Sequence, residues 1–364
     1  MITIRTPEIY INEPDILKSA GEYIVKLGKS ALIVGGITAL SVAGEELSSS
    51  LKASGVKFEV NEFKGYCTLD NIEKYTSLVK ELNVDILIGV GGGRVLDLVK
   101  VVGERSNVNV VTVPTIAATC AAWSALTVVY DEFGRHTEYI RLNTSPKLVL
   151  VDTKIISAAP VRFLNAGIGD TIVKWYESAP HAHDGINDIS LRIGIETSKL
   201  ALEILNNSAA IVSQNGGNGK VTQELSEVVD SIIILAGIVG SINGGNHRGA
   251  VAHALHDSFT SIADTHESLH GEKVIFGLIV QFIMEGKSLK EIDDLIIFLN
   301  KLNLPVTLKQ LGIIDNVSSK ISEVANGVKI IEHALDKLNF EVNIKLLEQA
   351  IKKADELGEN SLKA

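Results

Sequence analysis

Short apolar runs alternate with amphipathic segments over about the first 150 residues of the chain. Apolar runs of strand length predict buried strands, and longer segments with apolar positions three and four apart predict helices. Strands are predicted at 30–36, 56–63, 85–93, 109–115 and 147–152, and helices at 42–55, 70–82 and 94–102. Fully apolar strands separated by helices are typical of a parallel sheet that is covered on both faces.

The pattern changes after residue 152, where strand-like runs largely disappear. Pro160 suits the first turn of a helix, and helical periodicity continues from there through 163–178, 189–208 and 224–239 to the end of the chain. The sequence therefore predicts an α/β domain at 1–155 and an all-α domain at 156–364.

The 364 residues carry 34 basic and 44 acidic side chains, a formal net charge of −10. This balance argues against a nucleic-acid partner. The amino terminus does not have the form of a signal peptide, and the apolar run 231–242 is too short to span a bilayer, so no membrane partner is expected. Two cysteines without metal-type or redox spacing fit free thiols in a reducing cytoplasm.

A glycine-rich turn, Gly89 to Arg94, follows one predicted strand and opens the next predicted helix. Glycines let backbone N–H groups approach an anion, and a helix amino terminus adds partial positive charge, so the turn predicts phosphate binding. It matches neither GxGxxG nor the P-loop pattern, and a plain tight turn is the alternative interpretation. Asp97 and Lys100 lie three apart on the following helix face.

The segment 113–130 reads as the end of a strand followed by a loop of small residues and threonines. Small side chains let a flat ligand lie close to the backbone, and Thr115, Thr119 and Ser124 offer hydroxyl groups. The segment is a candidate wall for a cofactor.

Five of the nine histidines fall between residues 247 and 270, namely His247, His253, His256, His266 and His270. Histidine is the commonest metal ligand, although surface or core histidines could also cluster by chance. His253 and His256 share a helix face, and His270 begins a predicted helix. With Asp170, which lies on a helix behind two glycines, two histidines would form the open three-ligand set of a catalytic metal.

Residues 266–270, HESLH, match the HExxH pattern of zinc proteases. That pattern requires both histidines to lie within a helix. Gly271 follows at once and Ala-Asp-Thr precedes, so this segment is predicted to be a loop that leads into a helix. A protease would also leave the glycine turn unexplained.

The motifs GVGGGRVLDLVK, VPTIAATCAAWSALTVVY, AGIGDTIVKWYE, AVAHALHD and HGEKVIFG occur in an order that resembles the glycerol dehydrogenase branch of the iron-containing (group III) alcohol dehydrogenases. The resemblance covers nearly the whole chain. It implies a Rossmann-like amino-terminal domain that binds a nicotinamide cofactor, and a helical, metal-binding and catalytic domain. It further implies a divalent metal, usually zinc in this branch with iron as the alternative, and a homo-oligomer, either a dimer or an octamer.

Matching the motifs residue by residue, the resemblance implies Asp170, His253 and His270 as metal ligands, and His256 as a neighbouring group or proton relay. The cofactor would be bound by Gly36, Gly92, Gly93, Arg94, Val95, Leu96, Asp97, Thr115, Ala118, Ser124, Leu126 and Tyr130.

Two positions depart from the branch. Glycerol dehydrogenases usually have STDAP in the loop, whose Asp contacts the polyol, whereas this chain has Cys120 there and Trp123 nearby. In this respect it looks more like the hydroxycarboxylate dehydrogenase relatives, which act on 2-oxo acids. Gly36 stands where an acidic residue often holds the adenosine ribose and repels a 2′-phosphate, so the choice between NAD and NADP stays open.

The sequence thus predicts a cytoplasmic, metal-dependent NAD(P)(H) oxidoreductase with a small-molecule substrate, a 2-hydroxy acid or its 2-oxo acid, next to Cys120. A glycerol dehydrogenase that forms dihydroxyacetone is the alternative within the family. A lyase resembling dehydroquinate synthase and a binding protein without catalysis are the alternatives of other classes. The apolar loop disfavours the lyase, and the intact ligand set argues against the binding protein.

Overall fold

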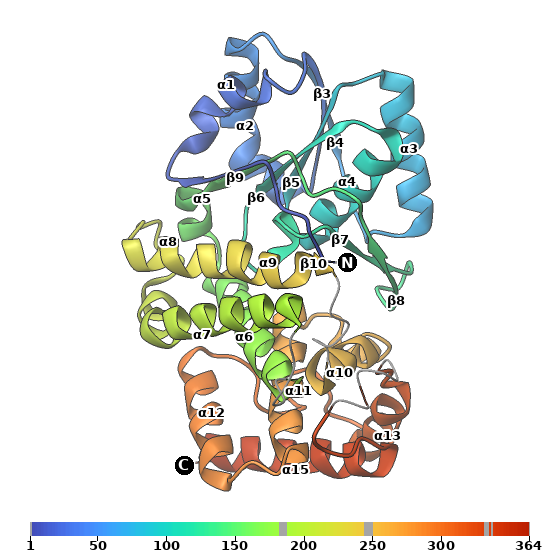
Figure 1. The fold of residues 1–364 in the computed structure, drawn as a ribbon, viewed down its shortest axis with the longest axis vertical. Helices are drawn as coiled ribbons and strands as arrows, with labels where there is room; N and C mark the ends of the chain where they lie inside the picture. Colours follow the sequence, from blue (N-terminus) through green and yellow to red (C-terminus); the bar gives the residue numbers. More distant parts are fainter. Residues whose placement is uncertain (1, 182–187, 244–249, 331–334, 336–337, 364) are drawn as a thin grey trace. The chain divides into compact units, whose positions relative to one another are not determined.

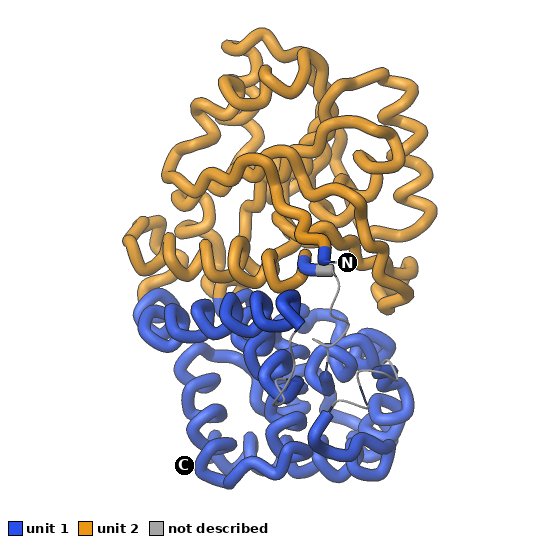
Figure 2. Tube along the Cα trace, in the orientation of Figure 1, with its two compact units in different colours: residues 1–2, 165–214, 242–364 blue, residues 3–164, 215–241 orange. Residues whose placement is uncertain are grey.

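The computed structural model describes residues 2–181, 188–243, 250–330, 335 and 338–363. By proximity of their Cα atoms, the residues group into two compact units (Figure 2). The sheet unit comprises Thr3–Leu164 and Asn215–Ser241, and the helical unit comprises residues 1–2, Asn165–Gln214 and Ile242–Ala364. The division differs from the single boundary expected near residue 155, because the helical segment 215–241 groups with the sheet.

Six parallel strands form the sheet, in the order β2-β9-β6-β5-β3-β4. They are β2 (Ile9–Glu13), β3 (Ser30–Gly35), β4 (Lys57–Glu62), β5 (Ile86–Gly91), β6 (Asn109–Pro114) and β9 (Leu148–Asp152). The five predicted strands are confirmed as β3, β4, β5, β6 and β9. Because β3 pairs with both β4 and β5, the strand order reverses beside β3, and ligands of open parallel sheets bind where this reversal occurs.

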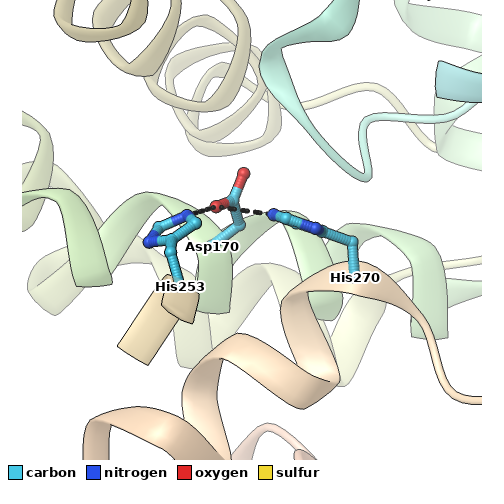
Figure 3. A group of neighbouring side chains, drawn as sticks. All are labelled: Asp170, His253 and His270. Atoms are coloured by element: carbon cyan, nitrogen blue, oxygen red, sulfur yellow. Dashed lines mark hydrogen bonds and ion pairs between the residues drawn. The ribbon is translucent and has the colours of Figure 1, made fainter. Parts of the chain in front are cut away.

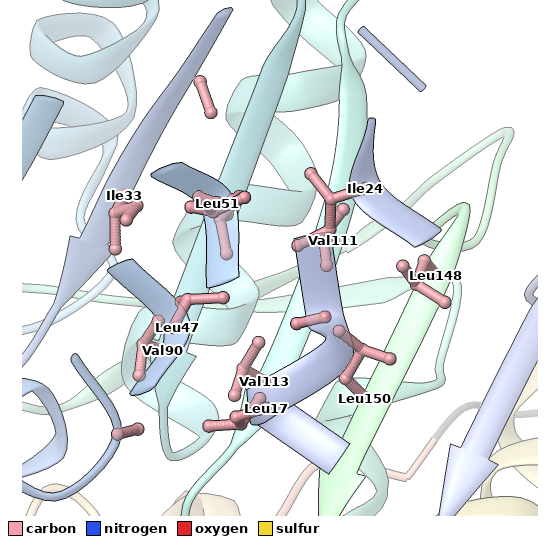
Figure 4. Close-up of a cluster of buried hydrophobic side chains, with 14 of the residues drawn as sticks. Leu17, Ile24, Ile33, Leu47, Leu51, Val90, Val111, Val113, Leu148 and Leu150 are labelled. Atoms are coloured by element: carbon pink, nitrogen blue, oxygen red, sulfur yellow. The ribbon is translucent and has the colours of Figure 1, made fainter. Parts of the chain in front are cut away.

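Helices cover both faces of the sheet, as predicted (Figure 1). Ile33 of β3 packs with residues of α1 and α2, whereas the neighbouring Leu32 packs with residues of α3 and α4 (Figure 4 shows the first cluster). The helices of this part of the chain are η1 (Ile16–Ser19), α1 (Ala20–Ile24), α2 (Ile37–Ala53), α3 (Leu69–Leu82), α4 (Gly93–Ser106) and α5 (Thr153–Ala158). Successive side chains of β3 therefore enter the cores on opposite faces of the sheet. A strand buried on both faces must be apolar at every position, which is why a continuous apolar run predicts one.

An antiparallel hairpin, β7 (Leu126–Tyr130) and β8 (His136–Arg141), was not predicted. The prediction of a loop reaching residue 130 was wrong for its last five residues, which form β7. Most of the β8 side chains are exposed, so the sequence HTEYIR carries no apolar pattern. A short helix η2 (Cys120–Ala122) lies between β6 and β7.

The helical segment 223–241 comprises α8 (Gln223–Asp230), a π-helical turn η4 (Ser231–Leu235) and α9 (Ala236–Ser241). It supports the loop before β7, because a Cβ on Gly237 would lie 2.5 Å from the Trp123 ring and the Ser241 hydroxyl accepts from the Ala125 N–H at 3.4 Å. Ile232, Ile233 and Val239 of this segment are buried. Across the described residues, no helix is both long enough and apolar enough to cross a membrane.

The helical unit is built from long helices with the pattern predicted after residue 160 (Figure 1). Its helices are α6 (Val161–Ser178), whose first turn lies in the sheet unit, η3 (Ala179–His181), α7 (Ile189–Asn215), α10 (Val251–Phe259), η5 (Ala263–Thr265), α11 (His270–Met284), α12 (Leu289–Lys301), α13 (Val317–Gly327) and α15 (Ile344–Lys363). Two strands of two residues, β1 (Thr3–Ile4) and β10 (Ile242–Asn243), complete the described elements.

Candidate metal centre and cofactor loops

Asp170, His253 and His270 meet in the helical unit, one from each of α6, α10 and α11 (Figure 3). The Asp170 Oδ1 atom lies 3.2 Å from His253 Nε2 and 3.4 Å from His270 Nε2. The carboxylate is 2% exposed, and both imidazoles are half-buried. One ligand atom from each residue lies within 4.8 Å of the others, a spacing that could hold a metal ion.

Close helix packing sets this spacing. His270 is the first residue of α11, and a Cβ on the next residue, Gly271, would lie 1.9 Å from the Ala166 carbonyl oxygen of α6. A Cβ on Gly277 would lie 2.7 Å from the Ala252 carbonyl oxygen of α10. These two glycines therefore let α11 approach both helices that carry the other candidate ligands.

His253 is held by the buried Glu177, which the sequence analysis did not single out. Glu177 Oε2 contacts His253 Nδ1, and its Oε1 accepts from the backbone N–H groups of His253 at 3.0 Å and Ala250 at 3.2 Å. Burial alone would raise the pKa of Glu177, but His253 holds it below its usual value. An ionised Glu177 accepts from Nδ1–H, which fixes the orientation of the ring and leaves Nε2 beside Asp170.

A second hydrogen-bonded pair supports His270. Its Nδ1 lies 2.9 Å from His256 Nε2, and His256 Nδ1 lies 3.0 Å from Asp257 Oδ1. His256 is 2% exposed, and burial, reinforced by His270, lowers its pKa to about 3. A neutral His256 accepts from His270 and donates to Asp257, so it contacts a candidate ligand and is not itself part of the three-residue group.

Lys174 lies one helical turn after Asp170 and reaches the same group. Its Nζ is 2.8 Å from Asp170 Oδ1 and 2.8 Å from His253 Nε2. Burial would raise the pKa of Asp170, but Lys174 and His270 hold it well below its usual range. Asp170 is therefore an ionised carboxylate within a buried site.

His266 takes no part in this group. It lies in the turn between η5 and α11, and its Nε2 is 3.1 Å from the Thr260 carbonyl oxygen. Residues 266–269 are not helical, which confirms the loop predicted for HESLH and removes the geometry that a HExxH protease needs. His247 lies outside the described residues.

The glycine turn joins β5 to α4 in the sheet unit, as predicted. Gly91 adopts a φ of 147°, which favours glycine, and Gly92 is the N-cap of α4. A Cβ on Gly91 would lie 3.5 Å from Ala39 Cβ, so the start of α2, capped by Gly36, lies beside this turn. Two helix amino termini thus adjoin the point where the strand order reverses, an arrangement suited to an anion.

Several residues expected to bind the cofactor have buried side chains. Val95 and Leu96 lie in the core, and the Asp97 carboxylate pairs with Lys100 Nζ at 2.9 Å and accepts from the Val128 N–H at 3.2 Å. Only their backbone could contact a cofactor. The exposed Arg94 guanidinium lies 4.3 Å from the centre of the Tyr66 ring.

Ser124 was expected to offer its hydroxyl to a ligand, but the buried Lys100 ammonium lies 3.2 Å from that hydroxyl and 3.0 Å from the Ser124 carbonyl oxygen. A buried ammonium needs these acceptors, which explains the difference. Trp123 is 7% exposed and packs on Tyr10 and Gly237, as a core residue does.

The remaining candidates lie around the same loop. Thr115 is buried and its N–H donates to the Gly91 carbonyl at 3.2 Å. Four others are half-buried, namely Ala118, Cys120, Leu126 and Tyr130. Gly93 begins α4 and is also partly exposed.

Comparison with known proteins connects this chain and its fold to a family. The family model for iron-containing alcohol dehydrogenase matches residues 7–153. The chain is 31% identical to a glycerol dehydrogenase of Citrobacter freundii, over 99% of this chain and 98% of the relative. It belongs to the iron-containing alcohol dehydrogenase family. Within this family, it is also 35% identical to hydroxycarboxylate dehydrogenase A of Escherichia coli, over 81% of this chain and 80% of that protein.

A solved structure shows the same fold over nearly the whole chain. A probable glycerol dehydrogenase from Sinorhizobium meliloti superimposes with a TM-score of 0.88 at 28% identity and covers 98% of this chain and 99% of its own. The expected architecture, a Rossmann-like parallel-sheet domain and a helical domain, is thereby confirmed. The chain is accordingly an oxidoreductase of a metal-dependent, nicotinamide-dependent dehydrogenase family.

Proposed function

We propose that the chain reduces a small 2-oxo acid with NAD(P)H and a proton, giving a 2-hydroxy acid and NAD(P)⁺, and catalyses the reverse reaction. The ligand set of Asp170, His253 and His270 carries the proposal of metal-dependent chemistry. The substrate class rests on Cys120 and on the similarity to a hydroxycarboxylate dehydrogenase. We further propose a cytoplasmic homo-oligomer, by analogy with the family.

The donor chemistry of the site fits a divalent metal, with zinc proposed and iron as the alternative. One carboxylate oxygen and two imidazole nitrogens leave a fourth tetrahedral position open, as catalytic zinc sites require. When bound, the ion supplies Lewis-acid polarisation of the substrate oxygen. Glu177 and His256 each hold the remote nitrogen of one histidine, the usual support for a ligating imidazole.

We propose that His256 positions His270. This role is supported over the expected proton relay because His256 is 2% exposed and its two ring nitrogens pair with His270 and Asp257. A relay at the reacting atoms would need His256 to reach the substrate or a water bound there.

Backbone N–H groups at the start of α4 are proposed to bind the cofactor pyrophosphate, with Gly92 and Gly93 allowing close approach. Gly36 carries no carboxylate that would repel a 2′-phosphate, so both NADH and NADPH are proposed as substrates of the enzyme. The nicotinamide provides the hydride, and the protein orients it.

The proposed substrate class depends on Cys120. An Asp would supply a strong acceptor for polyol hydroxyls and would repel an anionic substrate, whereas a thiol is a weak acceptor and removes that negative charge. Glycerol oxidation is the second candidate, since it is the activity named for several relatives.

Steady-state kinetics with 2-oxobutyrate, dihydroxyacetone and glycerol, with both nicotinamides and with or without zinc, test the proposal. We expect 2-oxobutyrate to have the highest kcat/KM, and Cys120→Asp to shift the preference towards glycerol and dihydroxyacetone. A wild-type preference for glycerol of tenfold or more, equivalent to about 1.4 kcal/mol, would refute the proposed substrate class. Full activity in the absence of both zinc and iron would refute the proposed metal dependence.

A further inference from the structure

The ammonium of Lys174 occupies a position that the proposed metal centre does not by itself explain. Its Nζ is 2.8 Å from both Asp170 Oδ1 and His253 Nε2. These are two of the three atoms proposed to hold a divalent cation. A second cation against the same atoms repels the first, so a neutral side chain would serve a purely structural role better.

The charge balance around the centre indicates what the lysine could bind. Among the described residues, the carboxylates within ion-pair distance of His253 or His270 are Asp170 and Glu177. Glu177 already accepts from His253 Nδ1 and from two backbone N–H groups. A divalent ion with Lys174 exceeds the two carboxylates by one formal positive charge. A monoanionic substrate would balance that excess.

The lysine has the reach and exposure that such binding requires. It lies on α6 four residues after Asp170, and its side chain is 17% exposed, so it is largely buried but still accessible to a small solute. Its flexible four-carbon stem lets the ammonium withdraw from the ligand atoms while its Cα keeps it beside them. Charge-assisted hydrogen bonds gain strength in such surroundings.

We propose that Lys174 binds the carboxylate of the 2-oxo or 2-hydroxy acid and selects anionic over neutral substrates. This inference rests on the proposed function. The carboxylate of a 2-oxo acid is bonded directly to the carbonyl carbon. A group that binds it must therefore stand next to whatever holds the carbonyl oxygen, and Lys174 stands next to the proposed metal ligands.

Two other roles for Lys174 give different outcomes. A proton donor to the reacting oxygen would act equally on charged and neutral carbonyls and would leave an ionisation in the pH profile of kcat. A residue needed only to keep the ligands in place would change metal content. A group that binds the carboxylate changes KM for the acid and leaves the metal bound.

The experiment compares Lys174→Met, which keeps the length without the charge, with Lys174→Arg, which keeps the charge. The matched substrates are 2-oxobutyrate and 1-hydroxy-2-butanone, which differ by a carboxylate against a hydroxymethyl group. We expect Lys174→Met to lower kcat/KM for 2-oxobutyrate by about 100-fold, mainly through KM, with a much smaller loss for the neutral ketone. Lys174→Arg should recover part of the loss.

Zinc content is measured in every variant, and the control is Lys290→Gln, which removes a positive charge from the exposed face of α12. Equal losses on both substrates, or loss of zinc together with activity, would overturn the role of Lys174. So would an unchanged KM for 2-oxobutyrate.

The two proposals can fail separately. If the wild type reduces only the neutral ketone, the proposed substrate class is wrong, and the lysine is then tested by inhibition of that reaction with oxamate, an unreactive analogue of a 2-oxo acid. Stronger inhibition of the wild type than of Lys174→Met would still support an anion-binding lysine. Equal inhibition would overturn it.

Discussion

His270 and His256 meet through their ring nitrogens, with Nδ1 of the first 2.9 Å from Nε2 of the second, although they belong to α11 and α10 respectively. The pair extends to Asp257 Oδ1. This chain of hydrogen bonds leaves one nitrogen of His270, Nε2, facing Asp170.

His256→Ala should therefore weaken metal binding by roughly 10- to 100-fold, the usual cost of losing the partner of a ligating histidine. The protein should stay folded and should regain activity at high zinc concentration. Competition with a zinc chelator measures the affinity, and circular dichroism monitors the fold. Unchanged zinc affinity together with a lost ionisation in the pH profile of kcat would instead favour the proton relay.

Removal of a ligand should have a larger effect. Asp170→Ala and His253→Ala should each lose the bound metal and nearly all activity, because two protein ligands hold zinc poorly. His266→Ala is the matched control, since His266 bonds to the Thr260 carbonyl outside the group. Elemental analysis of the purified variants decides: full occupancy in both ligand variants would contradict the assignment.

Gly36 offers a test of cofactor choice with little structural disturbance. A Cβ at this position meets no atom within 4 Å, and the residue has the extended backbone of an ordinary N-cap, so Asp is tolerated there. Gly36→Asp should weaken NADPH binding by about tenfold through repulsion of the 2′-phosphate, with NADH little affected. Fluorescence titrations measure both, and Gly36→Asn provides the uncharged control. Equal weakening of NADH and NADPH would show that charge is not the cause.

The two thiols should differ in reactivity. Cys67 is fully buried, and burial raises its pKa far above neutral, so it should resist iodoacetamide in the native protein even at about pH 9. Cys120 is half-buried and should react more readily. Mass spectrometry after native and denaturing labelling counts the sites. Cys67→Ser should leave native labelling unchanged, and rapid native modification of Cys67 would contradict this.

The parallel strands and the candidate ligands could be predicted from the sequence for physical reasons. A strand buried on both faces is apolar throughout, as in β3 and β5, and each candidate ligand lies near a recognisable helix start or within a strongly helical segment. The hairpin was not predicted because most side chains of β8 are exposed and need no apolar pattern. Periodicity shows which residues turn inward, but it does not show which separate segments meet.

Glu177 and Lys174 illustrate the same limit at the site. Both lie in the motif that contains Asp170, seven and four residues after it, so helical spacing places all three on neighbouring positions of one face. Neither role follows from spacing alone, because Glu177 acquires its partner from α10 and Lys174 acquires the second of its partners there. At Ser124 the sequence predicted a ligand contact, but the hydroxyl accepts from Lys100, twenty-four residues earlier in the chain.

Gly271 has no side chain, and this bears on how the metal preference of such a centre can change. A Cβ on Gly271 would lie 1.9 Å from the Ala166 carbonyl oxygen of α6, so any side chain at this position would force α6 and α11 apart. We therefore expect the spacing of the proposed ligands, and with it the preference for an ion of one radius, to depend on positions that do not touch the ion. Variation in the metal preference of such a centre could arise from substitutions at the helix crossing while all three ligands stay the same.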